Sequence, residues 1–403
     1  MSDWHASPFT GLFTRFGAMT SRPHDPDCAL SSGEFTTWTS GQPAATASGI
    51  GWDADAAAGA CVGEAIERLQ CAPLPDDEII TASYADWSRP ELAIDPVSWI
   101  LFHKEQYRQP GFPFQPLTRD TLCDWIAFRE AVSGERRWIP IDLAFLHLPA
   151  GHRVCPGYST GLAAGRIGEP VLLRGLQEVI ERDAVMGAWW RRYSIEEYTP
   201  PLDEATRARI ERPNLTYRFF RIASPFSFHV TMVTLEGEDR EGYCFSIGSS
   251  CRETRRQSWM KSLQEAIHGR HYVRYLKKRE AIRSERPPAS FAEHAAYYSL
   301  HPWRLKETIL APTAGRSRVE PFADEVEGID RLMERLGTHR PVLFRSMAPP
   351  ALAAEDLGWQ VLRVVVPGLQ PMHGDHALPH LGGPLWSPRG LAEWRNVPPH
   401  PFP

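Results

Sequence analysis

The sequence predicts an α/β protein of the mixed α+β kind, from a folded-protein composition and an alternation of long helical segments with β-rich runs. The 403 residues are 42% hydrophobic and 23% charged, with 44 basic and 49 acidic side chains. These values exclude a mostly disordered chain, a fibrous protein and a small disulfide-framework protein. Helical and strand-like segments follow one another along the chain, which favours mixed α/β or α+β architecture.

The first helix is expected over 53–71, after an N-terminal segment, 1–45, of loops and short strands packed on the core. That segment is rich in Gly, Ser, Thr and Pro and shows little periodicity. Asp53 or Asp55 can serve as the N-cap of the helix, and the alanines that follow carry its helix propensity. Residues 86–150 contain scattered aromatic residues and prolines without a clear period, so this segment is predicted to be irregular.

The second and third helices are expected further along, separated by strands. The second opens near Glu169-Pro170, because proline is favoured at the first helical position, and continues to Tyr193. The third runs from about Glu253 to Glu280. Strands are expected at 216–235, which holds two of them, and at 241–248, 340–346 and 359–367.

Composition also excludes several cellular settings and partners. No window approaches the roughly 18 consecutive apolar residues of a membrane span, and no secretory signal is visible. Seven cysteines at long spacings, without a CxxC pair, indicate free thiols in a reducing compartment. The net charge is −5, although residues 252–286 carry eleven basic and four acidic side chains on a probable helix face. We therefore expect a cytoplasmic protein with no membrane or nucleic-acid partner.

A repeated acidic pattern marks the three predicted helices. The first carries EAIER, the second EVIER and the third EAIHG. Two glutamates at i and i+3 lie on one helix face, where they repel each other unless a cation lies between them. The residues concerned are Glu64, Glu67, Arg68, Glu178, Glu181, Arg182, Glu265 and His268.

Two interpretations of this pattern stay open from the residues alone. Each motif could be a solvated helix face with an internal ion pair. The small and apolar neighbours of the acids instead favour buried helices whose carboxylates converge on Mg²⁺, and Mg²⁺ implies a nucleotide. The chain has no P-loop or Rossmann glycine motif, no G-x-S-x-G and no H-E-x-x-H, so a nucleotide would have to use other contacts.

Three segments in order carry a family resemblance. They are SGIGWDADAAAGACVGEAIERL, STGLAAGRIGEPVLLRGLQEVIERDAVMGAWW and the terminal PPHPFP, and VLRVVVPGLQPMHGDHALPHLGG supports them. Together they resemble the YcaO family, most of all its azoline-forming cyclodehydratases of thiazole/oxazole-modified peptides. The resemblance runs from about residue 45 to the end. It implies a YcaO-like ATP-binding fold over 46–403, with long helices that carry acidic residues into one nucleotide site.

The resemblance implies an ATP- and Mg²⁺-dependent reaction. A Cys, Ser or Thr of a ribosomally made precursor peptide would attack the preceding carbonyl, whose oxygen is then phosphorylated and lost, which leaves a thiazoline or oxazoline. The Mg²⁺ ligands carried over are Glu64, Glu67, Glu178 and Glu181. The ATP-binding set adds Arg68, Arg182, Glu265 and Arg270.

The proline-rich C-terminus is a candidate catalytic element. Proline is 36 of 403 residues, and the chain ends Pro399-His400-Pro401-Phe402-Pro403. Alternating prolines stiffen the backbone into an extended arm. In the family such a tail reaches the active site, so the terminal carboxylate is expected to act there as a base.

Partners and alternatives follow from the same resemblance. We expect a leader-binding partner protein, an FMN-dependent azoline dehydrogenase and hence a hetero-oligomer. One alternative is a YcaO enzyme that installs a thioamide, and another is a non-catalytic scaffold of the same fold. The sequence departs from the family pattern at Ala60, Pro170, His268 and Arg345, and of these Ala60 and Arg345 motivate the scaffold alternative.

Overall fold

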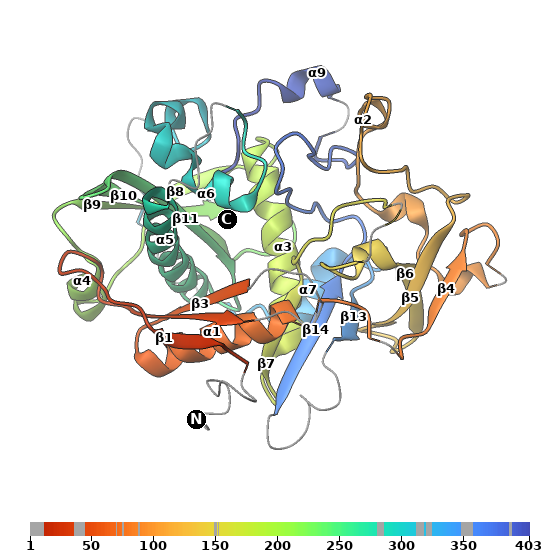
Figure 1. Ribbon diagram of the computed structural model, residues 1–403, viewed down its shortest axis with the longest axis horizontal. Coiled ribbons are helices and arrows are strands. Elements are labelled where there is room, and N and C mark those ends of the chain that lie inside the picture. Colours follow the sequence, from red (N-terminus) through yellow and green to blue (C-terminus); the bar gives the residue numbers. More distant parts are fainter. Residues whose placement is uncertain are drawn as a thin grey trace.

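Within its described residues, the computed structural model contains three β-sheets and three long helices, which confirms the mixed α+β class (Figure 1). None of the described helices is both long and apolar enough to cross a membrane. The seven cysteines, all of which are described, are free. The structure describes residues 12–35, 45–69, 71–74, 76–87, 89–148, 151, 153–279, 286–311, 318–319, 325–347, 358–386 and 389–403.

The three sheets are antiparallel except for one short pairing, of β12 with β8. The first sheet has the order β1 (Arg15–Ala18), β2 (Ala29–Phe35), β3 (Ala45–Gly51). The second has the order β11 (Gly242–Cys251), β10 (Val230–Asp239), β9 (Leu215–Ile222), β8 (Ile195–Thr199), β12 (Arg318–Val319). The third has the order β4 (Ile79–Ala82), β5 (Cys123–Glu130), β13 (Leu343–Ser346), β14 (Trp359–Val365), β7 (Leu162–Arg166), with β6 (Arg136–Pro140) beside β5.

The long helices lie where the sequence predicts them. They are α1 (Ala54–Leu69), α3 (Val171–Trp189) and α5 (Arg255–Lys278). Pro170 is the N-cap of α3, and Thr254 closes a capping box at the start of α5. The predicted end of the third helix, Glu280, lies outside the described residues. Shorter helices are α2 (Lys104–Tyr107), α4 (Glu204–Ile210), α6 (Phe291–Leu300), α7 (Ile329–Leu336) and α9 (Leu391–Trp394).

One prediction about the fold is wrong. Residues 86–150 are not wholly irregular, because β5 and β6 form an antiparallel pair there. Their buried residues include Trp125 and Trp138, which pack with Trp87 in a small aromatic cluster. Some of the aromatic residues that suggested irregular structure are therefore strand residues whose side chains face a core.

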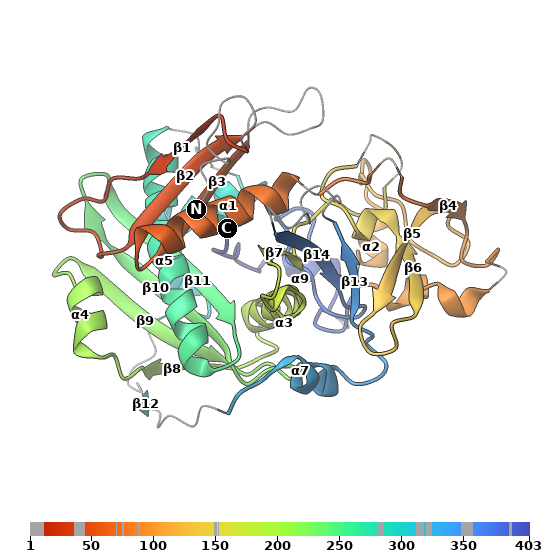
Figure 2. The ribbon, with the colours of Figure 1, turned by 90° about the horizontal axis from the view of Figure 1, so that it is seen from below.

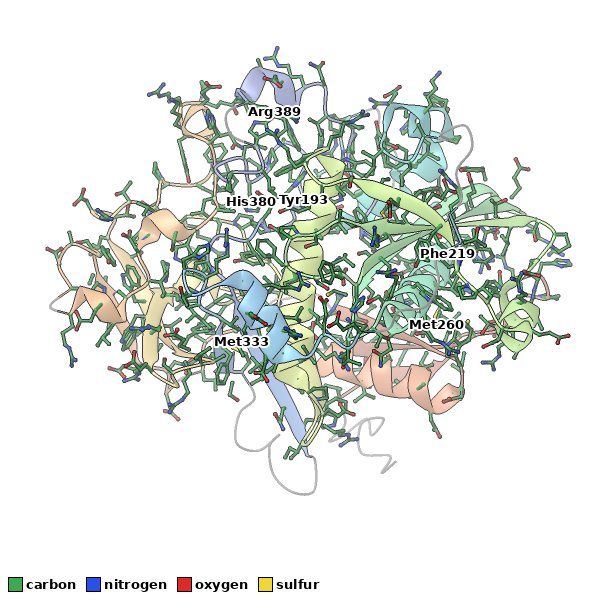
Figure 3. All side chains as sticks on the ribbon, turned by 180° about the vertical axis from the view of Figure 1, so that it is seen from behind. Tyr193, Phe219, Met260, Met333, His380 and Arg389 are labelled. Carbon is green, nitrogen blue, oxygen red and sulfur yellow. The ribbon has the colours of Figure 1, made fainter. Side chains whose placement is uncertain are left out.

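The helix α3 occupies the centre of the molecule. It contacts β11 of the second sheet and β7 and β14 of the third, and Figure 2 shows it end-on between those sheets. The helix α1 packs on β2, β3 and β7, and α5 packs on β10 and β11. On the α5 side, Phe219 of β9 and Met260 of α5 belong to one apolar cluster; both are labelled in Figure 3. The three acid-bearing helices are thus packed on shared sheets, α3 and α5 on the second and α1 and α3 on the third.

Two glycines let helices approach strands closely. A Cβ at Gly49 of β3 would lie 2.3 Å from the carbonyl oxygen of Ala57 in α1. A Cβ at Gly248 of β11 would lie 2.2 Å from the carbonyl oxygen of Ser262 in α5. Any other residue would push the helix away from the strand, so these glycines set how far α1 and α5 stand from their sheets.

The N-terminal segment is tied to the rest of the fold. Strand β2 pairs along its length with β3, which begins at Ala45. Before β2, Asp25 accepts hydrogen bonds from both terminal nitrogens of Arg274 in α5, at 2.7 and 2.9 Å. Both side chains are almost fully buried. Segment 1–45 therefore contributes to the core contacts of α5, and residues 1–11 and 36–44 of it lie outside the described residues.

Candidate functional site

The acidic residues predicted from the sequence come from three different helices and lie close to one another. Glu67 of α1 is within electrostatic range of Glu178 of α3. Arg182 of α3 is within the same range of Glu181, Glu178 and Glu265, the last of these on α5. We call these residues the carboxylate cluster: Glu64, Glu67, Glu178, Glu181, Glu265 and the central Arg182.

Negative charge in this cluster exceeds what its own cations neutralise. Burial, together with the neighbouring Glu178 and Glu64, raises the pKa of Glu67 well above its ordinary value. Burial also raises the pKa of Glu178 to about 6, with Arg182 opposing and Glu181 adding to the rise. Carboxyl groups that resist ionisation at neighbouring positions on two helices indicate a place where a further cation would be stabilised.

Other members of the cluster are oriented by hydrogen bonds. The carboxylate of Glu64 accepts from the backbone N–H of Ser48 at 2.7 Å and pairs with Arg68. Glu181 accepts from the hydroxyl of Ser249 at 2.6 Å and from Nη1 of Arg182 at 3.1 Å. Ser48 lies on β3 and Ser249 on β11, so hydrogen bonds from these two strands fix the positions of the Glu64 and Glu181 carboxylates.

Glu265 differs from Glu67 and Glu178 in its electrostatics. Burial alone would raise its pKa, but Lys261 and His268 outweigh it, and the pKa of Glu265 falls to about 2. Glu265 is therefore ionised at neutral pH and is paired with Lys261 one turn away. The α5 side of the cluster thus combines a carboxylate with cationic groups, which suits contact with phosphates and their counter-ion together.

The chemistry of the donor set fits Mg²⁺. Magnesium binds through a few carboxylates plus water and phosphate oxygens. Burial and neighbouring carboxylates raise the pKa values of Glu67 and Glu178, and a bound cation would lower them. Glu64, Glu67, Glu178 and Glu181 are thus the residues that would hold the ion.

Arg270 is the predicted site residue that the structure does not bring to the cluster. Its side chain is buried against the second sheet, where Nη1 donates to the carbonyls of Gly237 and Cys244 at 3.3 Å. Its Nη2 pairs with Asp239 at 2.9 Å. The expectation that Arg270 binds ATP is corrected on this geometry: it faces the sheet under α5, because it lies five residues after Glu265 and so on another side of the helix.

Three residues at this site escaped the sequence analysis. Ser249 of β11 bonds Glu181, and nothing in the strand sequence marks it. Lys261 could have been found as the i, i+4 partner of Glu265. Asp183 follows the EVIER motif; it accepts from the backbone N–H of Gln370 at 2.8 Å and from the hydroxyl of Tyr193 at 3.1 Å. It therefore anchors the PGLQP segment to α3.

The C-terminal arm, residues 398–403, is held along its carbonyl groups. Proline has no N–H to donate, and the arm is bound by side-chain donors instead. Trp189 of α3 donates to the carbonyl of Pro398, Tyr298 of α6 to that of Pro399, and His294 of α6 bonds that of His400, at 2.6–2.7 Å. The side chain of Phe402 is buried, and Pro403 is exposed.

The arm also approaches the carboxylate cluster. Arg182 is among the charged groups that act on His400, whose pKa is lowered mainly by burial. The chain end lies three residues beyond His400, a span of at most about 10 Å. The terminal region therefore lies between α3 and α6, beside the helix that carries two cluster acids (Figure 1).

Comparison with known proteins identifies the family. A family model described as YcaO cyclodehydratase, ATP- and Mg²⁺-binding, matches residues 48–370. The chain belongs to the YcaO family. A search of curated proteins found no match.

Solved YcaO-type structures share the fold. A heterocyclase in complex with substrate and cofactor superposes with a TM-score of 0.69 at 17% identity, covering 93% of this chain and 52% of that one. The chain therefore spans about half the length of that heterocyclase. YcaO from Methanopyrus kandleri bound with AMPPCP and Mg²⁺ gives 0.58 at 18% identity, covering 89% and 86%. A chain of the E. coli microcin synthetase McbBCD complex with pro-MccB17 bound gives 0.64 at 13% identity, covering 96% of both chains.

The four residues that depart from the family pattern have different structural environments. Arg345 of β13 pairs with Asp77 and donates to the carbonyl of Ala127, and neither of these partners is a cluster acid. Pro170 caps α3, and His268 helps to keep Glu265 ionised. Ala60 is exposed on α1. Of the four, only His268 contributes to the electrostatics of the cluster in this YcaO protein.

Proposed function

We propose that this YcaO protein catalyses the ATP-dependent cyclodehydration of Cys, Ser or Thr in a ribosomally made precursor peptide. The product is a thiazoline or an oxazoline, as in the azoline-forming branch of the family. The observation that carries the proposal is the carboxylate cluster. Glu67 of α1 lies near Glu178 of α3, the acids of α3 and α5 lie near Arg182, and the C-terminal arm approaches Arg182 through His400.

The cluster supports the nucleotide half of the reaction. Glu64, Glu67, Glu178 and Glu181 would hold Mg²⁺, which would supply positive charge to neutralise the ATP phosphates. Arg182 keeps its positive charge between Glu181 and Glu178, because these acids raise its pKa against the effect of burial. It can therefore orient the carboxylates and contact a phosphate oxygen. The backbone N–H of Ser48 and the hydroxyl of Ser249 keep the acids in place.

The arm supports the peptide half of the reaction. The precursor thiol or hydroxyl attacks the preceding carbonyl carbon, and the Pro403 carboxylate takes the proton that the nucleophile loses. The former carbonyl oxygen then accepts the γ-phosphoryl group of ATP, and ADP leaves. When the C–O bond breaks, phosphate departs and the amide nitrogen loses its proton, which forms the C=N bond of the ring. Pro399 and Pro401 stiffen the arm so that its carboxylate has little freedom to lose.

The proposal includes partners. The complexes of similar structures contain other subunits or peptide substrates, and the microcin synthetase complex is one with a bound peptide. We propose a leader-binding protein that delivers the precursor and an FMN-dependent dehydrogenase that oxidises azoline to azole, in one cytoplasmic hetero-oligomer.

The test is a reconstitution with purified protein, leader-binding partner, precursor and Mg·ATP. Mass spectrometry should show loss of one water per ring, with one ADP and one phosphate released. The Glu67→Gln variant should abolish water loss, and Glu211→Gln, an exposed acid paired with Arg207, is the matched control. If the wild-type protein hydrolyses ATP with a competent partner but the precursor loses no water, the proposal is wrong.

The same experiment separates the alternatives. A thioamide-forming enzyme would exchange oxygen for sulfur when a sulfur source is added, so the precursor mass would rise instead of falling. A scaffold would bind no Mg·ATP in calorimetry, and Glu67→Gln would leave the complex unchanged. The Pro-x-Pro-x-Pro ending, fully described and anchored to α3 and α6, favours cyclodehydration.

A further inference from the structure

A group of buried histidines lies at the base of the C-terminal arm. His294 comes from α6, and His373 and His376 from the loop that follows β14. One ring nitrogen of each lies within 4.8 Å of the others. All three side chains are buried, at 0%, 2% and 8% exposure. We call these residues the histidine triad.

Four of the six ring nitrogens of the triad have no hydrogen-bond partner within the described part of the chain. They are Nε2 of His294, both nitrogens of His373 and Nδ1 of His376. Buried polar atoms are normally bonded, and neighbouring imidazoles could in principle bond one another. The ring centroids are 5.9–6.1 Å apart, and no hydrogen bond joins the three side chains. Unpartnered nitrogens that face one another are the arrangement a metal ion would satisfy.

The surroundings orient the triad as metal-binding imidazoles are oriented. A ligating histidine usually gives its second nitrogen to a carbonyl group, which fixes the ring and the tautomer. Nδ1 of His294 bonds the carbonyl of His400 at 2.6 Å, so its Nε2 is the free acceptor. The backbone of Val397 interacts with His376, whose Nδ1 is free.

We propose that the histidine triad binds one divalent transition-metal ion, zinc in the first place. Imidazole suits zinc, and three histidines with one further position form a known type of zinc site. With Zn–N bonds of about 2.0–2.1 Å, tetrahedral ligands lie about 3.3 Å apart. The triad nitrogens therefore need side-chain adjustments of about 1 Å.

The ion would lock the C-terminal arm to the fold. His400 stacks on His294, with centroids 3.8 Å apart, and its Nε2 bonds the carbonyl of His373. A metal at the triad would therefore join α6, the loop after β14 and the arm at one point. This consequence for catalysis rests on the proposed function of the arm, whereas metal binding itself does not.

The first experiment measures metal in the full chain, produced in zinc-supplemented medium without a polyhistidine tag. We expect about one zinc per chain, a lower thermal midpoint after chelation and recovery of that midpoint with Zn²⁺. Replacement by Co²⁺ should give the visible absorption of a tetrahedral site. A folded wild-type chain that contains no metal, and whose midpoint Zn²⁺ and Co²⁺ do not change, would overturn the proposal.

Variants locate the site. His373→Gln and His376→Gln should each weaken zinc binding more than about 100-fold, beyond the 10–100-fold that loss of an orienting group causes. The matched control is His380→Gln: His380 is buried in the same loop, stacked on Phe102, and is not part of the triad (Figure 3). Zinc binding that survives in both triad variants, or that is lost equally in the control, contradicts the assignment.

Activity separates this proposal from the previous one. If both hold, chelation should lower ring formation more than Mg·ATP binding. If the chain binds zinc at the triad but forms no rings, the metal site stands and the proposed function fails. If rings form and no zinc binds, the proposed function stands and the metal site fails.

Discussion

The Glu178→Gln variant offers the sharpest test of the carboxylate cluster, because it should gain stability while it loses activity. In the native protein the pKa of Glu178 rises from its ordinary 4.5 to about 6, mainly through burial. The native state therefore holds this proton more tightly than the unfolded state does. The free energy of unfolding of the wild type therefore falls as pH rises from about 4.5 through 6, and it remains lower at pH 8.

The size of the effect follows from the pKa change. A rise of this size corresponds to about 2 kcal/mol, and a quarter of the Glu178 side chain is exposed, so screening reduces it to about 1–2 kcal/mol. Glutamine cannot ionise, and it also relieves the repulsion on Glu67. Without Mg²⁺ at pH 8, the variant should be more stable than the wild type by this amount. Near pH 4.5 the two proteins should be equally stable.

The assay combines denaturant unfolding with ATP turnover. Mg·ATP should stabilise the wild type through linkage, and it should stabilise Glu178→Gln much less, because a ligand to the ion is lost. Turnover should fall strongly. The exposed i, i+4 pair of Arg207 and Glu211 supplies the control, Glu211→Gln, which should change neither property. A variant that unfolds more easily at pH 8, or that keeps wild-type turnover, would refute this account of Glu178.

Three further predictions concern other parts of the molecule. Residues added after Pro403 should lower ring formation more than Mg·ATP binding, and unchanged ring formation would contradict a role for the terminal carboxylate. Asp25→Asn should cost about 3 kcal/mol in urea unfolding, because it removes the charged partner that accepts two hydrogen bonds from the buried Arg274. Burial raises the pKa of Asp25, but the hydrogen bonds from Arg274 and from the backbone of Arg22, together with the charge of Arg274, lower it below its ordinary value. This stability should therefore be present above pH 4 and lost below it in the wild type alone; parallel acid curves would contradict the assignment. Arg270→Gln should lower the midpoint of unfolding and leave Mg·ATP affinity intact, whereas Arg182→Gln should weaken that affinity, and the reverse order would restore Arg270 to the site.

Local signals were sufficient for much of the fold. The proline at the start of α3 predicts a helix start that the structure reproduces within about two residues, and α5 begins two residues after the predicted Glu253. The strands β5 and β6 were missed, because their aromatic residues pack against the distant Trp87 and show no clear alternation along the chain. Strand formation there depends on tertiary contacts that a single sequence does not display.

The candidate site also has features that the sequence predicts and features that depend on the tertiary structure. The spacing of each acidic pair places two carboxylates on one helix face, which is a local property and was predictable. The sequence did not predict the position of Arg270, because that position depends on tertiary contacts. Its partners are Asp239 and the carbonyls of Gly237 and Cys244, which lie on strands that only the fold brings under α5. The pairing of Ser249 with Glu181 is of the same kind.

The sequence by itself determined which helices form, which of their faces are acidic, and that the chain ends in a stiff proline-rich arm, because each property depends on residues within a few positions. Only the tertiary structure decided that Glu67 of α1 lies near Glu178, that Glu265 of α5 lies near Arg182, and that three histidines meet under the arm. Residues so far apart in sequence meet through the packing of whole helices on sheets. That packing depends on close approaches such as those at Gly49 and Gly248, which no local pattern encodes.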